Sequence, residues 1–223
     1  KDQRLQRFTT LSPVMPTTAK VVMGARALDG LSFTVQEPVL VERLASVAHR
    51  KDEQGRLHVV GTDPTVLAGR YRPNSPAPPQ LSTLWSTSPQ TGERTALHLA
   101  PCINPAGVKT KSPIQCVDPV MTQLPSGESR LFFVRMAGRA DPAFAGEPNL
   151  FYSATRMGDD SWTLDPGIRM SVVGAADPDV VRTHDGRFRM YFTRGTPDAQ
   201  GVVTGPGIFS AVSDDDAVSF SVE

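Results

Sequence analysis

The chain has little of what several classes of protein require. Lysine plus arginine equals aspartate plus glutamate at 23 each among 223 residues, so no excess of charge favours a nucleic-acid partner or an anionic membrane surface. No apolar run approaches the ~20 residues that a membrane-spanning helix needs. The N-terminus has neither the apolar core of a signal peptide nor an initiator methionine. We therefore expect no nucleic acid, no membrane insertion, and a mature or trimmed product.

Cysteine and histidine are scarce. Cys102 and Cys116 bracket a loop rich in proline, glycine and lysine with no histidine nearby, and the four histidines of the chain show no metal-binding spacing. Zinc is therefore excluded, and no metal is expected. A disulfide between the two cysteines would contribute about 3 kcal/mol by closing a short loop, and two free thiols are the alternative. The disulfide favours an oxidising compartment, either the outside of the cell or the periplasm.

What the chain does have is a repeat. Two segments open on Asp-Pro, continue as an apolar strand, turn at a polar hairpin with a glycine, and return as an aromatic strand. Asp118 precedes Gly127 by nine positions, and Asp177 precedes Gly186 by the same nine. The copies lie ~60 residues apart, a period that predicts a β-propeller or another array of β-repeats. The two segments are DPVMTQLPSGESRLFFVRM (Asp118–Met136) and DPDVVRTHDGRFRMYFTRG (Asp177–Gly195).

A third copy appears when the segments are aligned on the hairpin glycine. The segment Ala45–Asp63 turns at Gly55 and carries Ser46 where the other copies carry aspartate. After each turn apolar and polar residues alternate, as they do in a strand with one buried face. We expect an all-β propeller, of the five-bladed type, as a single domain over 1–223. Its blades would span about 34–93, 94–164 and 165–223, and 1–33 would hold the closing strands of another blade.

The copies are followed by a second pattern. VSDDDAVSF (Val212–Phe220) resembles the Asp-box of sialidase-like propellers, with looser versions at 27–33 and 155–163. In such a turn an aspartate accepts backbone N–H groups and a closing aromatic packs beneath the hairpin. We interpret Asp215 as a structural residue of this turn.

The segment GAADPDVVRTHDGRFRMYFTRG resembles the blade motif of five-bladed propeller glycoside hydrolases of the family 43, 32 and 62 type, which act on arabinans, xylans and fructans. The resemblance covers roughly 32–223 as repeated blade patterns. It implies a polysaccharide or oligosaccharide partner and hydrolysis of a glycosidic bond by carboxylates that meet in an axial funnel. It implies no cofactor, apart from a calcium ion in the channel for which the sequence offers no ligands.

In that group two aspartates and a glutamate share the chemistry, and Asp118 and Asp177 are the candidate catalytic residues here. Asp177 best matches the aspartate that orients and tunes the pair. The position of the base would then be Ser46, and that of the acidic glutamate would lie beyond Glu223. If Asp118 is the base, the tuning aspartate falls past the end. Two alternatives stay open: a chain whose missing blade holds the acid, or a non-catalytic glycan-binding or interaction propeller.

Three further residues are candidates for binding a sugar. Ser46 lies at the equivalent of the acid positions. Trp85 and Tyr191 could stack on sugar rings through their apolar faces. For Tyr191 the alternative is packing in the core or between blades.

Overall fold

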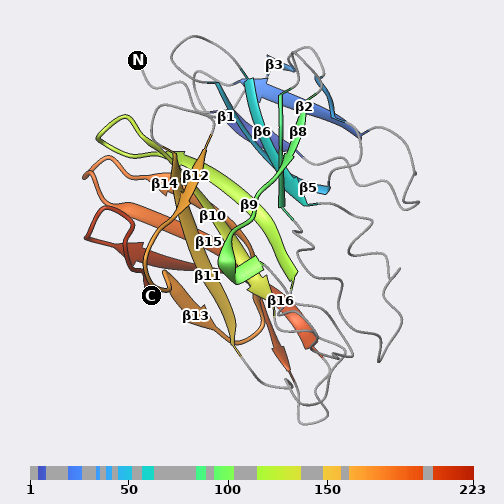
Figure 1. The fold of residues 1–223 in the computed structure, drawn as a ribbon. Helices are drawn as coiled ribbons and strands as arrows, with labels where there is room; N and C mark the ends of the chain where they lie inside the picture. The colour runs from blue at the N-terminus through green and yellow to red at the C-terminus, as the bar shows by residue number, and fades with distance from the viewer. Residues whose placement is uncertain are drawn as a thin grey trace.

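The structure is a computed structural model. In the part of the chain that it describes, the protein is almost entirely β-structure. These residues form antiparallel strands, with one short 3₁₀ turn, η1 (Ala100–Cys102) (Figure 1). The all-β prediction is confirmed. None of the described residues belongs to a helix with the length and apolar character needed to span a bilayer. The described residues are 5–8, 20–26, 34–35, 39–41, 45–51, 57–62, 84–88, 93–102, 115–136, 148–156, 161–197 and 203–223.

The strands form four sheets, each built from a continuous part of the chain. The first contains β1 (Leu5–Phe8), β2 (Lys20–Arg26), β3 (Thr34–Val35) and β4 (Val39–Val41). The second contains β5 (Ala45–Lys51), β6 (Leu57–Thr62), β7 (Leu84–Thr87) and β8 (Arg94–Ala96). The third contains β9 (Gln115–Gln123), β10 (Ser129–Met136), β11 (Asn149–Arg156), β12 (Trp162–Leu164) and β13 (Met170–Val172). The fourth contains β14 (Ala175–Arg182), β15 (Phe188–Pro197), β16 (Val203–Ser213) and β17 (Ser221–Val222).

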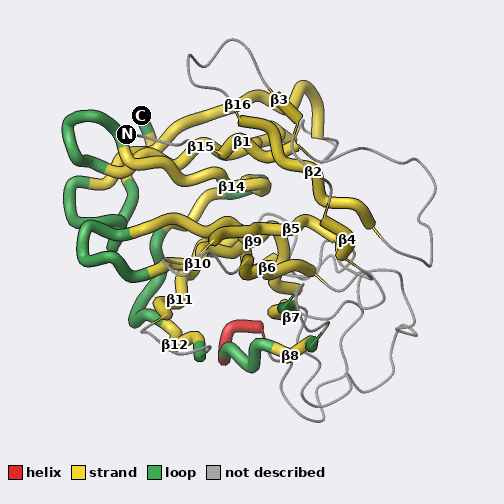
Figure 2. Tube along the Cα trace, turned by 90° about the horizontal axis from the view of Figure 1, so that it is seen from above, coloured by secondary structure: helices red, strands yellow, loops and turns green. Residues whose placement is uncertain are grey.

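The last three sheets meet along their first strands. In each, the first four strands pair in the order in which the chain makes them, and the first strand, which we call the inner strand, forms one edge of its sheet. The three first strands, β5, β9 and β14, lie side by side with β9 between the other two (Figure 2). Equivalent positions of the three sequence repeats are thereby brought close together in space.

Sheet membership departs from the predicted blade boundaries at two places. Strands β3 and β4 pair with β2, although the boundary was expected at residue 34. Strand β13 pairs with β11, although it follows the boundary expected at 165. In both places a short strand pairs with the sheet that precedes the expected boundary. A local pattern of two or three residues does not specify which sheet a strand joins.

Strand β10 is buried on both faces because it lies in the middle of three stacked sheets. Leu131 and Phe133 pack toward the second sheet, and Phe132 and Val134 pack toward the fourth. All four side chains are fully buried. A strand buried on both faces needs a continuous apolar run rather than alternation, which explains the run Leu-Phe-Phe-Val.

Strand β15 of the fourth sheet buries only one face. Phe188, Met190 and Phe192 belong to the core shared with the third sheet. On the opposite face Tyr191 is 40% exposed. Counted from the hairpin glycines, Tyr191 occupies the position of Phe132, which is 0% exposed. Packing of Tyr191 in the core is therefore not what the structure shows.

Two of the predicted hairpins have one geometry. Gly127 and Gly186 have φ of 90° and 87°, a region that glycine enters without steric cost. The amide of each glycine donates to the carbonyl three residues earlier, at 3.0 Å in both hairpins. The third hairpin glycine, Gly55, lies outside the described residues. The hairpin prediction is confirmed for the two later copies.

The predicted disulfide is present. Cys102 and Cys116 are bonded, with their Cα atoms 5.2 Å apart and both side chains fully buried. The bond joins η1 to β9, the strand that also carries Asp118. It therefore ties the connection between the second and third sheets to an inner strand.

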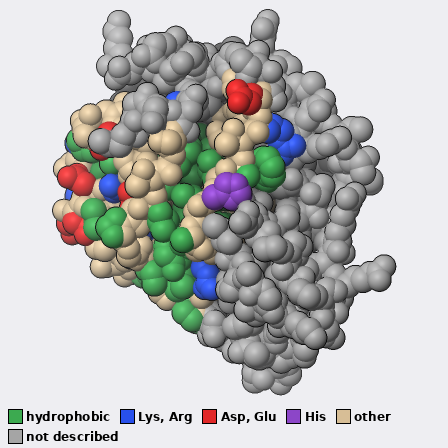
Figure 3. Space-filling view, in the orientation of Figure 1, with side chains coloured by type: hydrophobic (Ala, Val, Ile, Leu, Met, Phe, Trp, Pro, Cys, Tyr) green, Lys and Arg blue, Asp and Glu red, His purple; other side chains and the backbone are tan. Residues whose placement is uncertain are grey.

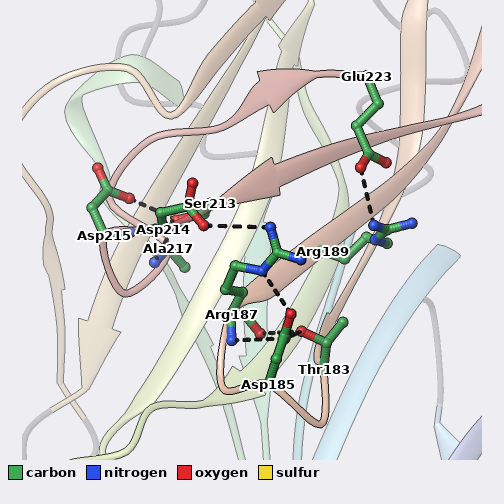
Figure 4. Close-up of polar contacts among 9 residues, drawn as sticks. All are labelled: Thr183, Asp185, Arg187, Arg189, Ser213, Asp214, Asp215, Ala217 and Glu223. Atoms are coloured by element: carbon green, nitrogen blue, oxygen red, sulfur yellow. Dashed lines mark hydrogen bonds and ion pairs between the residues drawn. The ribbon is translucent and has the colours of Figure 1, made fainter.

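The turn between β16 and β17 is organised by one carboxylate (Figure 4). Asp215 Oδ1 accepts hydrogen bonds from Ser213 Oγ at 2.6 Å and from the Ser219 amide at 2.9 Å. Asp215 Oδ2 accepts from Ser219 Oγ at 2.7 Å. The turn places Phe220 edge-on against Phe132, with ring centroids 5.9 Å apart, so it fastens the fourth sheet to the third. The looser versions of this pattern, 27–33 and 155–163, lie wholly or partly outside the described residues.

We expect Asp215→Ala to lower the free energy of unfolding by about 1–2 kcal/mol at neutral pH, since the side chain is largely exposed. Burial raises the pKa of Asp215, but hydrogen bonds from Ser213 and Ser219 outweigh this and lower it to about 2 from 3.8. A folded-state pKa below the unfolded value contributes stability above the unfolded pKa. The difference between the wild type and Asp215→Ala should therefore shrink as the pH falls from about 4 to about 2.

Thermal unfolding of both proteins at pH 7 and at pH 2 measures this difference. Asp214→Ala is the matched control, because Asp214 is exposed and contacts only Arg187, at 3.6 Å, among the contacts that the described residues show in this turn. Equal losses from the two substitutions at pH 7 would contradict the structural interpretation of Asp215.

Candidate functional site

The inner strand of each stacked sheet is interrupted at the repeated Asp-Pro position. There the antiparallel register slips, so that two residues of the inner strand lie opposite one residue of the next strand. Such β-bulges bend a strand and redirect a side chain out of the regular alternation. The facing residues are Ser46 and Val47 opposite Gly61, Asp118 and Pro119 opposite Phe133, and Asp177 and Pro178 opposite Phe192.

The first residue of every bulge has a left-handed backbone. Ser46, Asp118 and Asp177 have φ of 44°, 52° and 50°. Residues other than glycine avoid this region, and at Asp118 and Asp177 the following proline disfavours a helical backbone further. A backbone of this kind costs about 1–3 kcal/mol and persists only where the surrounding structure enforces it, which is common at functional sites. The same strain at three equivalent positions singles them out as the candidate site.

The structure brings the two predicted catalytic acids together. The backbone N–H of Asp177 donates a hydrogen bond to Asp118 Oδ2 at 3.4 Å. This bond crosses from the third sheet to the fourth, because β9 and β14 are neighbouring inner strands. The Asp118 side chain is half-buried and Asp177 is exposed. The Asp118 carboxylate thus lies beside the backbone of Asp177, whose own side chain is exposed.

The carboxylate of Asp177 is held from within its own sheet. Thr193 Oγ1 lies 2.9 Å from Asp177 Oδ2 and 3.2 Å from the carbonyl oxygen of Ala176. Thr193 is on β15, and it faces Ala176 directly before the bulge. The Asp177 carboxylate therefore has a hydroxyl partner in its own sheet, and the Asp118 carboxylate has a backbone amide partner in the next sheet.

The third bulge supplies a hydroxyl in place of an acid. Ser46 is half-buried on β5, the inner strand on the other side of β9. The candidate site therefore holds Ser46, Asp118 and Asp177 on three adjacent inner strands. Two of its three equivalent positions carry a carboxylate.

The two aromatic candidates lie differently with respect to the acids. Tyr191 is exposed on β15 and shares a strand face with Thr193, two residues away. Trp85 lies on β7, the third strand of its sheet, half-buried beneath the guanidinium of Arg94 at 5.1 Å. Tyr191 thus belongs to the same sheet face as the Asp177 partner, whereas Trp85 is two strands away from the inner edge.

Charge is spread rather than concentrated. On the face seen in Figure 3, acidic and basic side chains of the described residues are interspersed. Among the described residues, no group of three or more histidine, cysteine, aspartate or glutamate side chains is placed to hold a metal ion. The carboxylates and hydroxyls of the site can transfer protons, form hydrogen bonds with hydroxyl groups and stabilise positive charge.

Sequence reasoning missed Thr193, although a signal for it exists. Thr193 follows the hairpin glycine Gly186 by seven positions, and Thr62 follows Gly55 by the same seven. The middle copy has Val134 there. A hydroxyl recurring seven residues after the hairpin glycine in two of the three copies would have marked the position.

Comparison with known proteins identifies the architecture. No family model and no curated protein matches the sequence. Among solved structures, the endo-arabinase of Bacteroides thetaiotaomicron superposes with a TM-score of 0.55 at 16% identity, over 91% of this chain and 71% of that protein. A family 117 glycoside hydrolase of Zobellia galactanivorans gives 0.53 at 11% identity, over 99% and 60%. The xylan β-1,4-xylosidase of Bacillus halodurans gives 0.52 at 14% identity, over 88% and 36%.

The chain therefore spans less than two thirds of the length of two of these three proteins. At such identities the likeness lies in the fold. Four antiparallel sheets, three of them with adjacent inner strands, agree with it. The chain folds as a β-propeller of the kind found in these glycoside hydrolases.

Proposed function

We propose that this protein is a carbohydrate-active propeller that hydrolyses a glycosidic bond in a polysaccharide or oligosaccharide, with Asp118 and Asp177 among its catalytic carboxylates. The observation that carries the proposal is the contact between Asp118 Oδ2 and the amide of Asp177, made between two strained bulges on neighbouring inner strands. The fold likeness to an endo-arabinase and a xylosidase supports the same class of substrate.

The chemistry needs two carboxyl groups at one bond. One, protonated, gives its proton to the leaving glycosidic oxygen, and the other, ionised, acts on the anomeric carbon or on a water molecule. Asp118 and Asp177 supply two carboxyl groups on adjacent strands, as candidates for the base and for the tuning residue in the implied scheme, and Ser46 supplies a hydroxyl that can bond to a sugar hydroxyl. Tyr191 offers an exposed aromatic ring to a neighbouring sugar unit.

We also propose that the protein works outside the cell or in the periplasm. The support is the buried bond between Cys102 and Cys116, because disulfides persist in oxidising compartments.

A second candidate function is binding of a glycan without hydrolysis. The observation that favours it is Ser46, because the third equivalent bulge has no carboxylate. A site with two acids can still hold a sugar by hydrogen bonds to its hydroxyl groups.

Turnover of aryl arabinofuranosides, aryl xylosides, linear arabinan, xylan and fructan separates the two functions. We expect hydrolysis of at least one, and we expect Asp177→Asn to lower kcat/KM by about 10²–10⁴-fold, the usual contribution of an acid–base group. Circular dichroism must show that the variant is folded. Full activity of Asp177→Asn would refute the site. Retention on the polysaccharides in affinity electrophoresis without turnover would favour glycan binding. If the protein shows no turnover and no retention, both functions are contradicted.

A further inference from the structure

The hydroxyl of Thr193 has one proton and two acceptors within reach. The acceptors are Asp177 Oδ2 at 2.9 Å and the carbonyl oxygen of Ala176 at 3.2 Å. When Asp177 is ionised, Thr193 donates to the carboxylate. When Asp177 is protonated, its O–H can donate to Thr193 Oγ1, and Thr193 then donates to Ala176. The hydroxyl can therefore accompany either state of the acid without leaving a polar group unpaired.

The backbone conformation of Asp177 explains why its side chain needs a contact that holds it in place. The residue has φ of 50° and precedes proline, so the local chain does not favour the conformation by itself. Thr193 faces Ala176, the last regularly paired residue before the bulge. The hydrogen bond from Thr193, which is paired with Ala176, therefore fixes the side chain of the next residue, Asp177.

The first copy of the repeat contains the same threonine without its acid. Thr62 faces Ala45 directly before the bulge at Ser46, in the register by which Thr193 faces Ala176. The Thr62 side chain is 0% exposed, and its Oγ1 has no hydrogen-bond partner among the residues that the structure describes. Buried hydroxyl groups are rarely left unpaired, because the loss of hydrogen bonding to water costs free energy.

The middle copy shows the contrast. Val134 occupies the corresponding place, and it faces Val117 before the bulge at Asp118. Asp118 is held instead by the amide of Asp177 in the next sheet. The threonine thus accompanies Asp177, whose carboxylate it contacts, and a valine stands at the corresponding place beside Asp118, whose carboxylate accepts a bond from the next sheet.

We propose that Thr193 is the positioning residue of Asp177, and that Thr62 is a second copy of the same element whose acid has been replaced by Ser46. The structural pairing stands on the contacts above, and its consequence for catalysis rests on the proposed function.

The pairing is tested without any substrate by two double-mutant cycles read as melting temperatures. In the fourth sheet, Asp177→Ser and Thr193→Val are made singly and together. In the second sheet, Ser46→Asp is made with Thr62 intact and with Thr62→Val. We expect Ser46→Asp to lower the melting temperature by roughly 4 °C more when Thr62 is valine, the size expected for one charge-assisted hydrogen bond in a chain of this length. The Asp177–Thr193 cycle should depart from additivity by a similar amount.

Additive melting temperatures in the Asp177–Thr193 cycle would overturn the positioning role. Additivity in the Ser46–Thr62 cycle alone would overturn the second half of the proposal. Should Ser46→Asp fail to fold beside Thr62, the expectation that this threonine accepts an acid partner is likewise wrong, and the fourth-sheet cycle still decides the first half.

The catalytic consequence is tested on the aryl glycoside that the protein turns over. We expect Thr193→Val to lower kcat by ~10-fold or more with KM nearly unchanged, because a misplaced group loses transition-state stabilisation rather than binding. Thr193→Ser should restore kcat to within about 3-fold, since the hydroxyl returns. Thr163→Val, on the exposed face of the outer strand β12, should leave both constants unchanged.

This design separates the two failures. If Asp177→Asn abolishes turnover while Thr193→Val keeps the wild-type kcat, the positioning role is wrong and the proposed function stands. If Asp177→Asn turns over normally, the proposed function is wrong, and the melting-temperature cycles still decide whether threonine and acid are paired.

Discussion

Replacing Phe132 by alanine should lower the free energy of unfolding by about 4 kcal/mol, within the range for phenylalanine truncations in cores. Phe132 is fully buried between the third and fourth sheets and contacts Phe220 edge-on. Its removal leaves a cavity that the two packed sheets can close only in part. Tyr191→Ala, at the equivalent place in the fourth sheet, should cost less than about 1 kcal/mol, because that ring is already 40% exposed.

Urea unfolding of the two variants and the wild type measures both values. The slope of the free energy against urea should stay constant, which shows that only stability has changed. Phe132→Leu is the matched variant that keeps an apolar side chain, and it should lose about half as much as the alanine variant. Similar losses from Phe132→Ala and Tyr191→Ala would contradict the asymmetry of the two sheets.

The features that follow from local sequence were predictable. A glycine at φ near 90° closes each described hairpin, and the polar residues around Gly127 and Gly186 are typical of such turns. The alternation expected after each hairpin, with one buried face, describes β15, but it is wrong for β10, because residues 131–134 are fully buried on both faces. Because the spacing from the Asp-Pro position to the hairpin glycine is constant, these local elements could also be recognised as repeats, and the repeats predicted the β-propeller.

The details of the site come from contacts between sheets, and these were beyond the sequence. Asp-Pro predicts an extended residue before proline, yet Asp118 and Asp177 are left-handed, because each opens a β-bulge. The bond from the Asp177 amide to Asp118 depends on how two sheets pack. No pattern within one repeat contains that information. The strands at 34–41 and 170–172 joined unexpected sheets for the same reason.

Asp118→Asn should lower kcat by about 10³-fold on a substrate that the protein turns over, with KM within about 3-fold of the wild type. Asparagine has the shape of aspartate, and its amide oxygen can still accept the bond from the Asp177 amide. The substitution thus keeps the contact that joins the two bulges and removes the negative charge and the capacity to carry a proton. A fall in kcat then reports the chemistry of the carboxylate rather than the packing of the strands.

Ser46→Ala is the matched control at the equivalent bulge. It removes a hydroxyl from the same left-handed position on β5, and it removes no charge. If Ser46 binds a sugar hydroxyl, KM should rise about 5-fold, the effect of one neutral hydrogen bond, and kcat should hold. Measured kcat and KM of the two variants then separate an acid that acts in the reaction from a hydroxyl that binds substrate. A kcat for Asp118→Asn no lower than that of Ser46→Ala would mean that the carboxylate serves the bulge and not the reaction, since both variants preserve the backbone and only one preserves the charge.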